Sequence, residues 1–257
     1  MYAQIYVCRV AFEEYRVRSG TRATLLDEAY WLTKLMHESI VKLTHWEENV
    51  SGLVLMMEFV PGVNLLTYVL DSLMVEGEVR ELALQLCRLV QYLQLNQVAH
   101  RDVKPDNLMM RSAVSDSFAV VLVDFGLVRS CSALGGCCTL CGTPVYMAPE
   151  VVSIGGMSRI LRTSRSYGWK CDVWSVGVLL HAAVSGTLPY DTVVCQGIHF
   201  QSEHILRAGP QFHEAQWYFC SMECRDVIRS MMCVSPIARP SSATLLEKSW
   251  VRGTSLF

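Results

Sequence analysis

Eight residues near the middle of the chain constrain its fold most strongly: His100-Arg101-Asp102-Val103-Lys104-Pro105-Asp106-Asn107. This stretch combines two acidic and two basic side chains with an amide, and its proline prevents a regular helix. Apolar residues precede it at Val98-Ala99 and follow it at Leu108-Met109-Met110. The pattern predicts a polar loop held between two buried segments, as a catalytic loop on a rigid scaffold is.

Composition limits the classes of partner that the chain can have. It has 257 residues, enough to bury a large core, of which 51% are apolar, and its formal net charge is −2. This balance is not typical of a disordered tail, a nucleic-acid-binding surface or a polybasic membrane anchor. We therefore expect no nucleic acid and no membrane among its partners.

Two further features bear on location. The first residues show no charged region leading into an apolar one, so no signal peptide is predicted. The longest apolar stretch, Val173 to Leu188, is interrupted by Gly177 and His181 and therefore predicts a buried helix rather than a membrane span. Together with the cysteine usage, these features predict a cytoplasmic protein.

The eleven cysteines are an odd number, and reduced, mostly buried thiols are the expected state without a secretory signal. The Cys-x-x-Cys spacing of Cys138 and Cys141 leaves a zinc or redox site open as an alternative, with Cys131 and Cys137 nearby. No second Cys or His pair stands at the spacing of a zinc finger, which disfavours the zinc interpretation.

Local patterns predict an order of elements. Apolar residues at helical spacing run from Leu25 to Met36, where His37-Glu38-Ser39 ends the predicted helix. A second helix is predicted over 80–92 from the apolar face of Leu82, Leu86, Leu89, Val90 and Leu93. Strands are predicted from β-branched and aromatic runs at 5–10, from Ile40 onward, at 53–59 and at 120–123.

The central loop resembles the catalytic loop of eukaryotic protein kinases, H-R-D-x-x-x-x-N. Two further motifs support the resemblance: Asp124-Phe125-Gly126 is similar to the D-F-G element, and Ala148-Pro149-Glu150 to the A-P-E element that closes the activation segment. Lys104, two residues after Asp102, is typical of the serine/threonine branch.

The resemblance implies an α+β, bilobal, protein-kinase-like fold. Residues 1–60 would form a truncated, β-rich N-lobe, and residues 61–257 a complete helical C-lobe similar to that of calmodulin-dependent kinases. Asp172 would anchor the backbone of the catalytic loop, and Arg239 would form a buried ion pair with Glu150.

The implied chemistry is transfer of the ATP γ-phosphate to a Ser or Thr hydroxyl of a protein substrate. Asp102 would orient the hydroxyl and accept its proton, and Lys104 would stabilise the γ-phosphate. Thr143 would bridge these two residues. Asn107 and Asp124 would hold two Mg²⁺ ions, because carboxylate and amide oxygens suit that cation.

For the nucleotide, the resemblance implies contacts from the N-lobe and from the connection between the lobes. Glu28 fits the Glu that pairs with the strand Lys of the family, but the expected lysine position is Arg9, unless the register differs. Met57 would be the gatekeeper, although a plain buried strand explains it equally. The expected nucleotide contacts are Val7, Arg9, Glu28, Met57, Glu58, Val60 and Met109.

The glycine-rich loop that covers the ATP phosphates in kinases has no counterpart before Arg9. One hypothesis is a Ser/Thr kinase whose first two strands are missing from this sequence. A second is a pseudokinase or scaffold with impaired ATP binding, and a third is an unfolded fragment with no function of its own.

Thr139 stands where some kinases carry an activating phosphothreonine, which implies an upstream kinase. Arg101 and Arg129 would accept the phosphate, which adds about −1.5 to −2 charges. The alternative is an unmodified loop threonine. The chain between Glu150 and Asp172 is longer than is usual in the family, and its basic residues predict a solvated insertion.

Overall fold

The computed structural model describes residues 6–12, 21–49, 52–112, 118–132, 135–154, 166–190, 209–213 and 215–254. Side chains are described throughout these ranges except at 6–12, 21–24, 49 and 112. The strands are β1 (Tyr6–Phe12), β2 (Leu43–Asn49), β3 (Gly52–Glu58), β4 (Val98–Ala99), β5 (Leu108–Ser112), β6 (Phe118–Leu122) and β7 (Arg129–Ser130). The α-helices are α1 (Thr21–Lys34), α2 (Leu65–Asp71), α3 (Glu76–Leu95), α4 (Pro149–Ile154), α5 (Lys170–Ser185), α7 (Met222–Met231), α8 (Ser242–Leu246) and α9 (Ser249–Arg252). The 3₁₀ turns are η2 (Pro105–Asn107), η3 (Pro144–Tyr146) and η4 (Ala215–Phe219).

The first strands form an antiparallel sheet in the order β1-β3-β2. The strand expected to begin at Ile40 begins at Leu43 instead. Ile40 forms an isolated bridge with Leu122, and the backbone N of Val41 donates to the carbonyl O of Leu122 at 3.0 Å. The stretch before β2 therefore attaches to strand β6, and the chain enters the sheet only after it.

Helix α1 packs on this sheet through Leu25 and Ala29, which form a buried cluster with Leu53 and Leu55 of β3. The apolar spacing correctly predicts the buried face of the helix. It is wrong at Met36, which is 80% exposed, because the helix ends at Lys34 and the helical spacing no longer applies beyond it.

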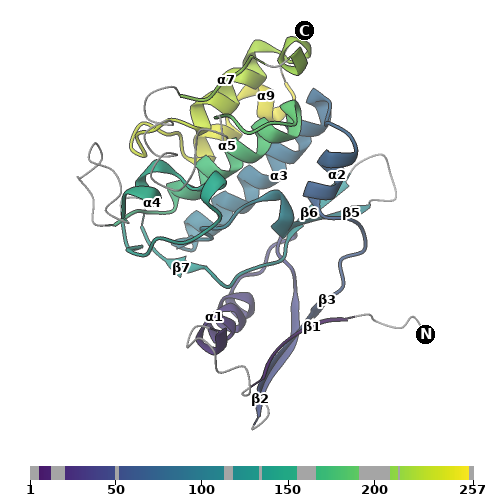
Figure 1. Ribbon diagram of the computed structural model, residues 1–257, viewed down its shortest axis with the longest axis vertical. Helices are drawn as coiled ribbons and strands as arrows, with labels where there is room; N and C mark the ends of the chain where they lie inside the picture. Colours follow the sequence, from purple (N-terminus) through teal and green to yellow (C-terminus); the bar gives the residue numbers. More distant parts are fainter. Residues whose placement is uncertain are drawn as a thin grey trace.

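The remaining helices gather at the other end of the molecule, with α3 and α5 side by side at their centre (Figure 1). Fourteen of the sixteen residues of α5 are buried, as the long apolar stretch predicts. Gly186 ends the helix with φ 72°, a left-handed conformation that glycine adopts at little cost. Helix α5 is thus a buried element at the centre of the helical part.

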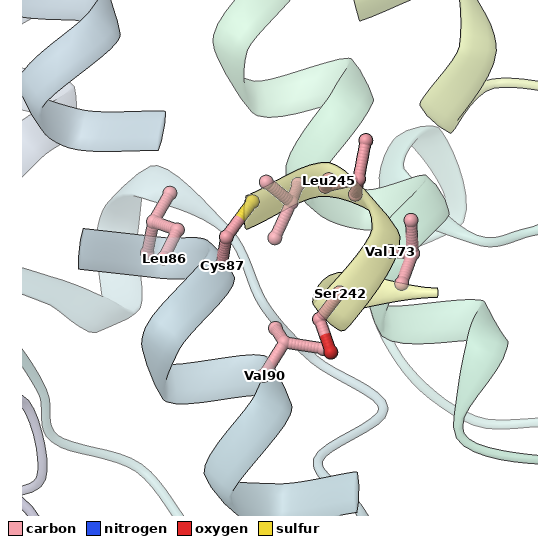
Figure 2. Close-up of a pocket in the computed structure, with 7 residues that line it drawn as sticks. Leu86, Cys87, Val90, Val173, Ser242 and Leu245 are labelled. Atoms are coloured by element: carbon pink, nitrogen blue, oxygen red, sulfur yellow. The ribbon is translucent and has the colours of Figure 1, made fainter. Parts of the chain in front are cut away.

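Figure 2 shows the seam where α3, α5 and α8 meet. Leu86, Cys87 and Val90 of α3 face Val173 of α5 and Leu245 of α8 across a small apolar gap. The gap leaves no room for a water molecule, so it is part of the packed core.

One short hairpin, β5–β6, and one short antiparallel strand pair, β4–β7, flank the loop 100–107. Strand β5 pairs with β6 in a register that sets Leu108 opposite Leu122, and β4 pairs with β7. The segregation of a small sheet with α1 from a helical part confirms the expected α+β class. Within the described residues, no helix combines the length and the apolar character that crossing a membrane requires.

Candidate active site

The loop 100–107 is anchored by Asp172 in the first turn of α5. The backbone N of His100 donates to Asp172 Oδ2 at 2.7 Å, and that of Arg101 to Oδ1 at 2.8 Å. Asp172 is fully buried, and burial raises its pKa, although the His100 and Arg101 groups favour its charged form. A buried carboxylate therefore fixes the backbone on which the next side chains stand, as the resemblance predicts.

His100 connects this loop to the segment after β6. Its Nε2 faces the carbonyl O of Asp124, and its Nδ1 accepts from the backbone N of Asp102 at 3.3 Å. These partners fix the tautomer, with the proton on Nε2. Burial lowers the pKa of His100, and the ring of Phe125 packs edge-on at 5.0 Å between centroids. The imidazole thus ties the two polar segments together.

Asp102, Lys104 and Thr143 form a compact cluster. Thr143 donates to Asp102 Oδ1 from its backbone N at 2.9 Å and from Oγ1 at 2.7 Å. Lys104 Nζ lies 2.7 Å from Thr143 Oγ1 and 3.1 Å from Asp102 Oδ2. The Thr143 hydroxyl therefore bridges the acid and the base, which is the arrangement expected from the sequence.

Asn107 lies beside Asp102 and at the root of the β5–β6 hairpin. Its Nδ2 donates to the carbonyl O and to Oδ2 of Asp102 at 3.0 and 3.1 Å. The backbone N of Val123 donates to Asn107 O at 3.0 Å, which continues the hairpin pairing toward Asp124. Asp124 Oδ1 accepts from the backbone N of Gly126 at 3.1 Å. Asn107 comes directly before β5 and Asp124 follows β6, so both residues lie at the same end of this hairpin. Both carry the oxygen atoms that Mg²⁺ prefers.

Glu28 reaches the same region from α1. Its side chain is 1% exposed, and its Oε1 accepts from the backbone N of Phe125 at 3.4 Å. Val7 and Arg9 lie on β1 opposite Met57 and Leu55, but their side chains are outside the described residues. The expected pairing of Arg9 with Glu28 stays a prediction.

The other residues expected to contact the nucleotide lie at the junction of the sheet and the helical part. Met57 and Val60 are buried, and Met109 pairs with Val121 in the β5–β6 hairpin. The carboxylate of Glu58 accepts from the backbone N of Lys42 at 3.2 Å and forms an ion pair with Arg111 at 3.2 Å. The Glu58 side chain thus links Lys42 to Arg111 at this junction. The expected contact of the Glu58 backbone with adenine stays a prediction.

The side chain of Thr139 contacts the guanidinium group of Arg101. The Nη1 of Arg101 donates to Thr139 Oγ1 at 2.8 Å, and the expected role of Arg101 toward a phosphate stays a prediction. The second expected acceptor, Arg129, has its Nη2 2.8 Å from Asp27 Oδ2 on α1 instead. The two arginines are equivalent candidates by sequence, and the position of α1 determines which of them faces Thr139.

Sequence reasoning missed Tyr167, which is 2% exposed. Its hydroxyl donates to the carbonyl O of Thr139 at 2.8 Å and accepts from Arg101 Nη1 at 3.3 Å. Its backbone N and O pair with those of Cys137 at 2.9 and 3.1 Å. No pattern in the sequence links position 167 to position 139, because the contact depends on the tertiary fold that brings these two residues together.

The expected ion pair between Arg239 and Glu150 is confirmed. It is bidentate, with Nη1–Oε1 at 2.7 Å and Nη2–Oε2 at 3.0 Å, and the Arg239 side chain has no exposed surface. Arg239 also donates to the carbonyl O of Lys170 at 2.7 Å. Through these contacts Arg239 joins Glu150 to Lys170, the first residue of α5.

The cysteine alternative gains no support from the geometry. Among the described residues, no group of three or more His, Cys, Asp and Glu side chains is arranged to hold a metal ion. Cys138 and Cys141 are both free thiols. The expected basic insertion at 155–165 lies outside the described residues.

Comparison with known proteins agrees with this geometry. The ovarian-specific serine/threonine-protein kinase Lok of Drosophila melanogaster is 31% identical over 233 residues, 89% of this chain and 46% of that protein. A calcium/calmodulin-dependent protein kinase type 1 of Caenorhabditis briggsae is 30% identical over 93% of this chain and 63% of its own length. A probable myosin light chain kinase of Dictyostelium discoideum is 30% identical over 91% of this chain and 72% of its own length. The chain thus spans less than half of the Drosophila relative. The family model for the protein kinase domain matches residues 3–251, and the chain therefore belongs to the protein kinase family.

Proposed function

We propose that this chain is a protein serine/threonine kinase domain that transfers the ATP γ-phosphate to Ser and Thr hydroxyls of protein substrates. The observation that supports this most is the cluster of Asp102, Lys104 and Thr143, whose polar atoms lie within 3.1 Å of their neighbours. The Drosophila relative is named a serine/threonine-protein kinase and the Caenorhabditis relative a protein kinase, and both names favour the same activity.

In this proposal Asp102 orients the substrate hydroxyl and accepts its proton. Its Oδ1 is held by Thr143 and its Oδ2 by Asn107 and Lys104, so the carboxylate is fixed before the substrate binds. Lys104 places a positive charge next to Asp102, where it would stabilise the γ-phosphate. The barrier falls mainly through positioning and charge neutralisation.

Asn107 and Asp124 would hold Mg²⁺ on the ATP phosphates. Their oxygen donors fit that cation, and the β5–β6 hairpin brings the two residues to the same edge of the loop. When bound, Mg²⁺ neutralises the charge on the phosphates. Met57, Glu58, Val60 and Met109 would surround the adenine, and Val7, Arg9 and Glu28 would act toward the phosphates.

We further propose Thr139 as the target of an upstream kinase, since its hydroxyl already faces the Arg101 guanidinium. The free thiols of the described residues favour a reducing compartment, and we propose the cytoplasm.

The deciding experiment is transfer of radiolabelled phosphate from ATP to Ser- and Thr-containing peptides, with Asp124→Ala as the inactive control. Transfer well above that control, recovered as phosphoserine or phosphothreonine, is the expected result. Equal signals from the two proteins would exclude kinase activity for this chain and leave the scaffold interpretation.

The role of Arg9 is tested separately by nucleotide binding, with Arg9→Lys and Arg9→Ala compared. If Arg9 acts toward the phosphates, the alanine variant binds ATP more weakly and the lysine variant binds it at least as well. Unchanged binding in the alanine variant would remove Arg9 from the proposed site.

A further inference from the structure

A short segment that follows α4 lies beside Ser132 and Cys137, in the stretch of chain that leads to Thr139. These residues, 166–169, are called the strap. At one end, the backbone N of Trp169 donates to Ser132 O at 3.3 Å. At the other, Tyr167 and Cys137 exchange two backbone hydrogen bonds of 2.9 and 3.1 Å as an antiparallel bridge. The strap therefore fixes the backbone two residues before Thr139.

The Tyr167 side chain extends this attachment to Thr139 itself. Its hydroxyl donates to the Thr139 carbonyl at 2.8 Å, and Arg101 Nη1 donates both to Tyr167 Oη at 3.3 Å and to Thr139 Oγ1 at 2.8 Å. One phenol and one guanidinium nitrogen thus hold the backbone oxygen and the side-chain oxygen of the same residue. Burial raises the pKa of Tyr167, although Arg101 opposes this, so the hydroxyl stays a proton donor.

The attachment continues toward the candidate active site. Gly142 has φ 104°, and a Cβ at that position would clash with the carbonyl O of Arg101. The chain between Thr139 and Thr143 therefore turns tightly against the backbone of Arg101. Since Thr143 then contacts Asp102 and Lys104, displacement of Thr139 would be transmitted to that cluster.

We propose that Tyr167 is a positioning residue that holds Thr139 against Arg101 in the unphosphorylated chain. The segment leading to Thr143 is then ordered before any phosphate is added, and modification of Thr139 strengthens an arrangement that already exists. The ordering is independent of catalysis, whereas its effect on turnover rests on the kinase activity proposed above.

Tyr167→Phe tests the ordering, because it removes the hydroxyl and keeps the ring and the backbone bridge. Tyr190→Phe is the matched control: Tyr190 is 3% exposed, and its hydroxyl donates to the carbonyl O of Val145 at 2.5 Å. Hydrogen exchange at the amides of 139–143 should become about fivefold faster in Tyr167→Phe, as expected for the loss of the hydrogen bond from Tyr167 to the Thr139 carbonyl, and should not change in Tyr190→Phe. Equal exchange in Tyr167→Phe and the parent protein overturns the proposal, as does an equal increase in both variants.

Kinetic measurements on the chain with and without a phosphate on Thr139 separate a positioning role of Tyr167 from an effect on overall stability. In the unphosphorylated chain, Tyr167→Phe should lower kcat/KM for peptide about fivefold with little change in KM for ATP. When phosphothreonine is incorporated at position 139, the loss should fall below about twofold, because the phosphate then binds Arg101 directly. An equal loss in both forms overturns the positioning role. If the parent protein transfers no phosphate beyond Asp124→Ala, the proposed function fails and hydrogen exchange alone decides on Tyr167.

Discussion

The Thr143 hydroxyl joins Lys104 to Asp102 Oδ1, since it contacts both at 2.7 Å. Thr143→Val removes that oxygen with little change in volume, whereas Thr143→Ser keeps it. We expect the valine variant to lose about 10- to 100-fold in kcat/KM for peptide and the serine variant to lose much less, because catalysis here depends on fixed polar groups. Steady-state phosphate transfer measures both. Similar losses in the two variants would contradict a role for the hydroxyl.

Arg239 is a buried charge whose removal should clearly destabilise the fold. Arg239→Ala leaves the Glu150 carboxylate, 10% exposed, without its bidentate partner. We expect a loss of about 3–5 kcal/mol in the free energy of unfolding, measured by urea denaturation. Arg229→Ala is the control, since Arg229 forms an ion pair with Asp226 at a site where both side chains are more than half exposed. That variant should lose at most about 1 kcal/mol, and comparable losses in both would refute the assignment.

Much of the candidate site could be predicted from sequence at the level of single residues, because the resemblance to protein kinases implies which side chains meet even when they are far apart in the chain. Asp102, Lys104 and Thr143 meet as expected, and so do Glu150 and Arg239. Contacts between residues to which the kinase motifs assign no partner could not be predicted. Neither the pairing of Arg129 with Asp27 nor the contact of Tyr167 with Thr139 follows from spacing, because both join segments whose relative position is set by packing.

At the level of elements, the close approach of α5 and α7 depends on Gly177. A Cβ there would lie 2.8 Å from the Cβ of Met231 and 2.9 Å from the Cγ of Met232. Gly177→Ala should therefore destabilise the protein by about 1–3 kcal/mol through overpacking. Gly77→Ala provides a control of opposite sign. Gly77 lies in α3, and a Cβ added to it would meet no described atom within 4 Å, so alanine should stabilise by about 0.5–1 kcal/mol. Thermal unfolding of both variants tests the pair, and a shift of the same sign in both would contradict the packing argument.

Glu76 joins three helices and gives the fold a pH dependence. Its carboxylate accepts from Ser221 Oγ at 2.5 Å, from Ser221 N at 2.7 Å and from Trp250 Nε1 at 2.7 Å. Burial raises the pKa of Glu76, but these hydrogen bonds outweigh it and leave the pKa below its usual 4.5. A lowered carboxyl pKa contributes stability above the unfolded-state value, and this contribution is lost as pH falls through the folded-state value.

Glu76→Gln should therefore be clearly less stable than the parent protein at pH 7 and closer to it at about pH 3.5, below the unfolded-state value. Urea denaturation at the two pH values measures the change. Glu223→Gln, at an exposed position of α7, makes the same change of charge and is the control for that change. A stability difference for Glu76→Gln that does not depend on pH would refute the assignment.

Element boundaries are predictable only where local patterns decide them. The apolar stretch of α5 and the face of α3 are buried as predicted, since both helices are surrounded by other elements. The predicted start of β2 is wrong because Ile40 and Val41, although β-branched, attach to Leu122 instead of the sheet. A β-branched residue can pair either with Leu122 or with the sheet, and the amino-acid sequence does not indicate which.

At the scale of the whole molecule, α5 is the reference to which the functional segments are attached. Asp172 holds the backbone of the loop 100–107, and Arg239 joins the base of the helix to Glu150. The sheet is attached differently. The sheet and α1 meet the helical part through the stretch 40–42 and through Glu28, whose carboxylate accepts from the backbone N of Phe125 at 3.4 Å. Two partly exposed ion pairs, Glu58–Arg111 and Asp27–Arg129, add to this contact. Opening of the sheet should therefore cost less free energy than opening of the helical part.

Strand β1 is where this difference should be largest. It is one of the two outer strands in the order β1-β3-β2 and pairs with β3 along one side, whereas α5 is buried over fourteen residues. An edge strand has backbone groups on its outer side that the sheet does not pair. We expect native-state hydrogen exchange at residues 6–12 to be faster than at the interior amides of α5, and to respond less to Gly177→Ala. Because Gly177→Ala destabilises the contact of α5 with α7, it should speed exchange in the helical part first. Exchange at β1 as slow as in α5 would show that the sheet and the helices open as one cooperative unit.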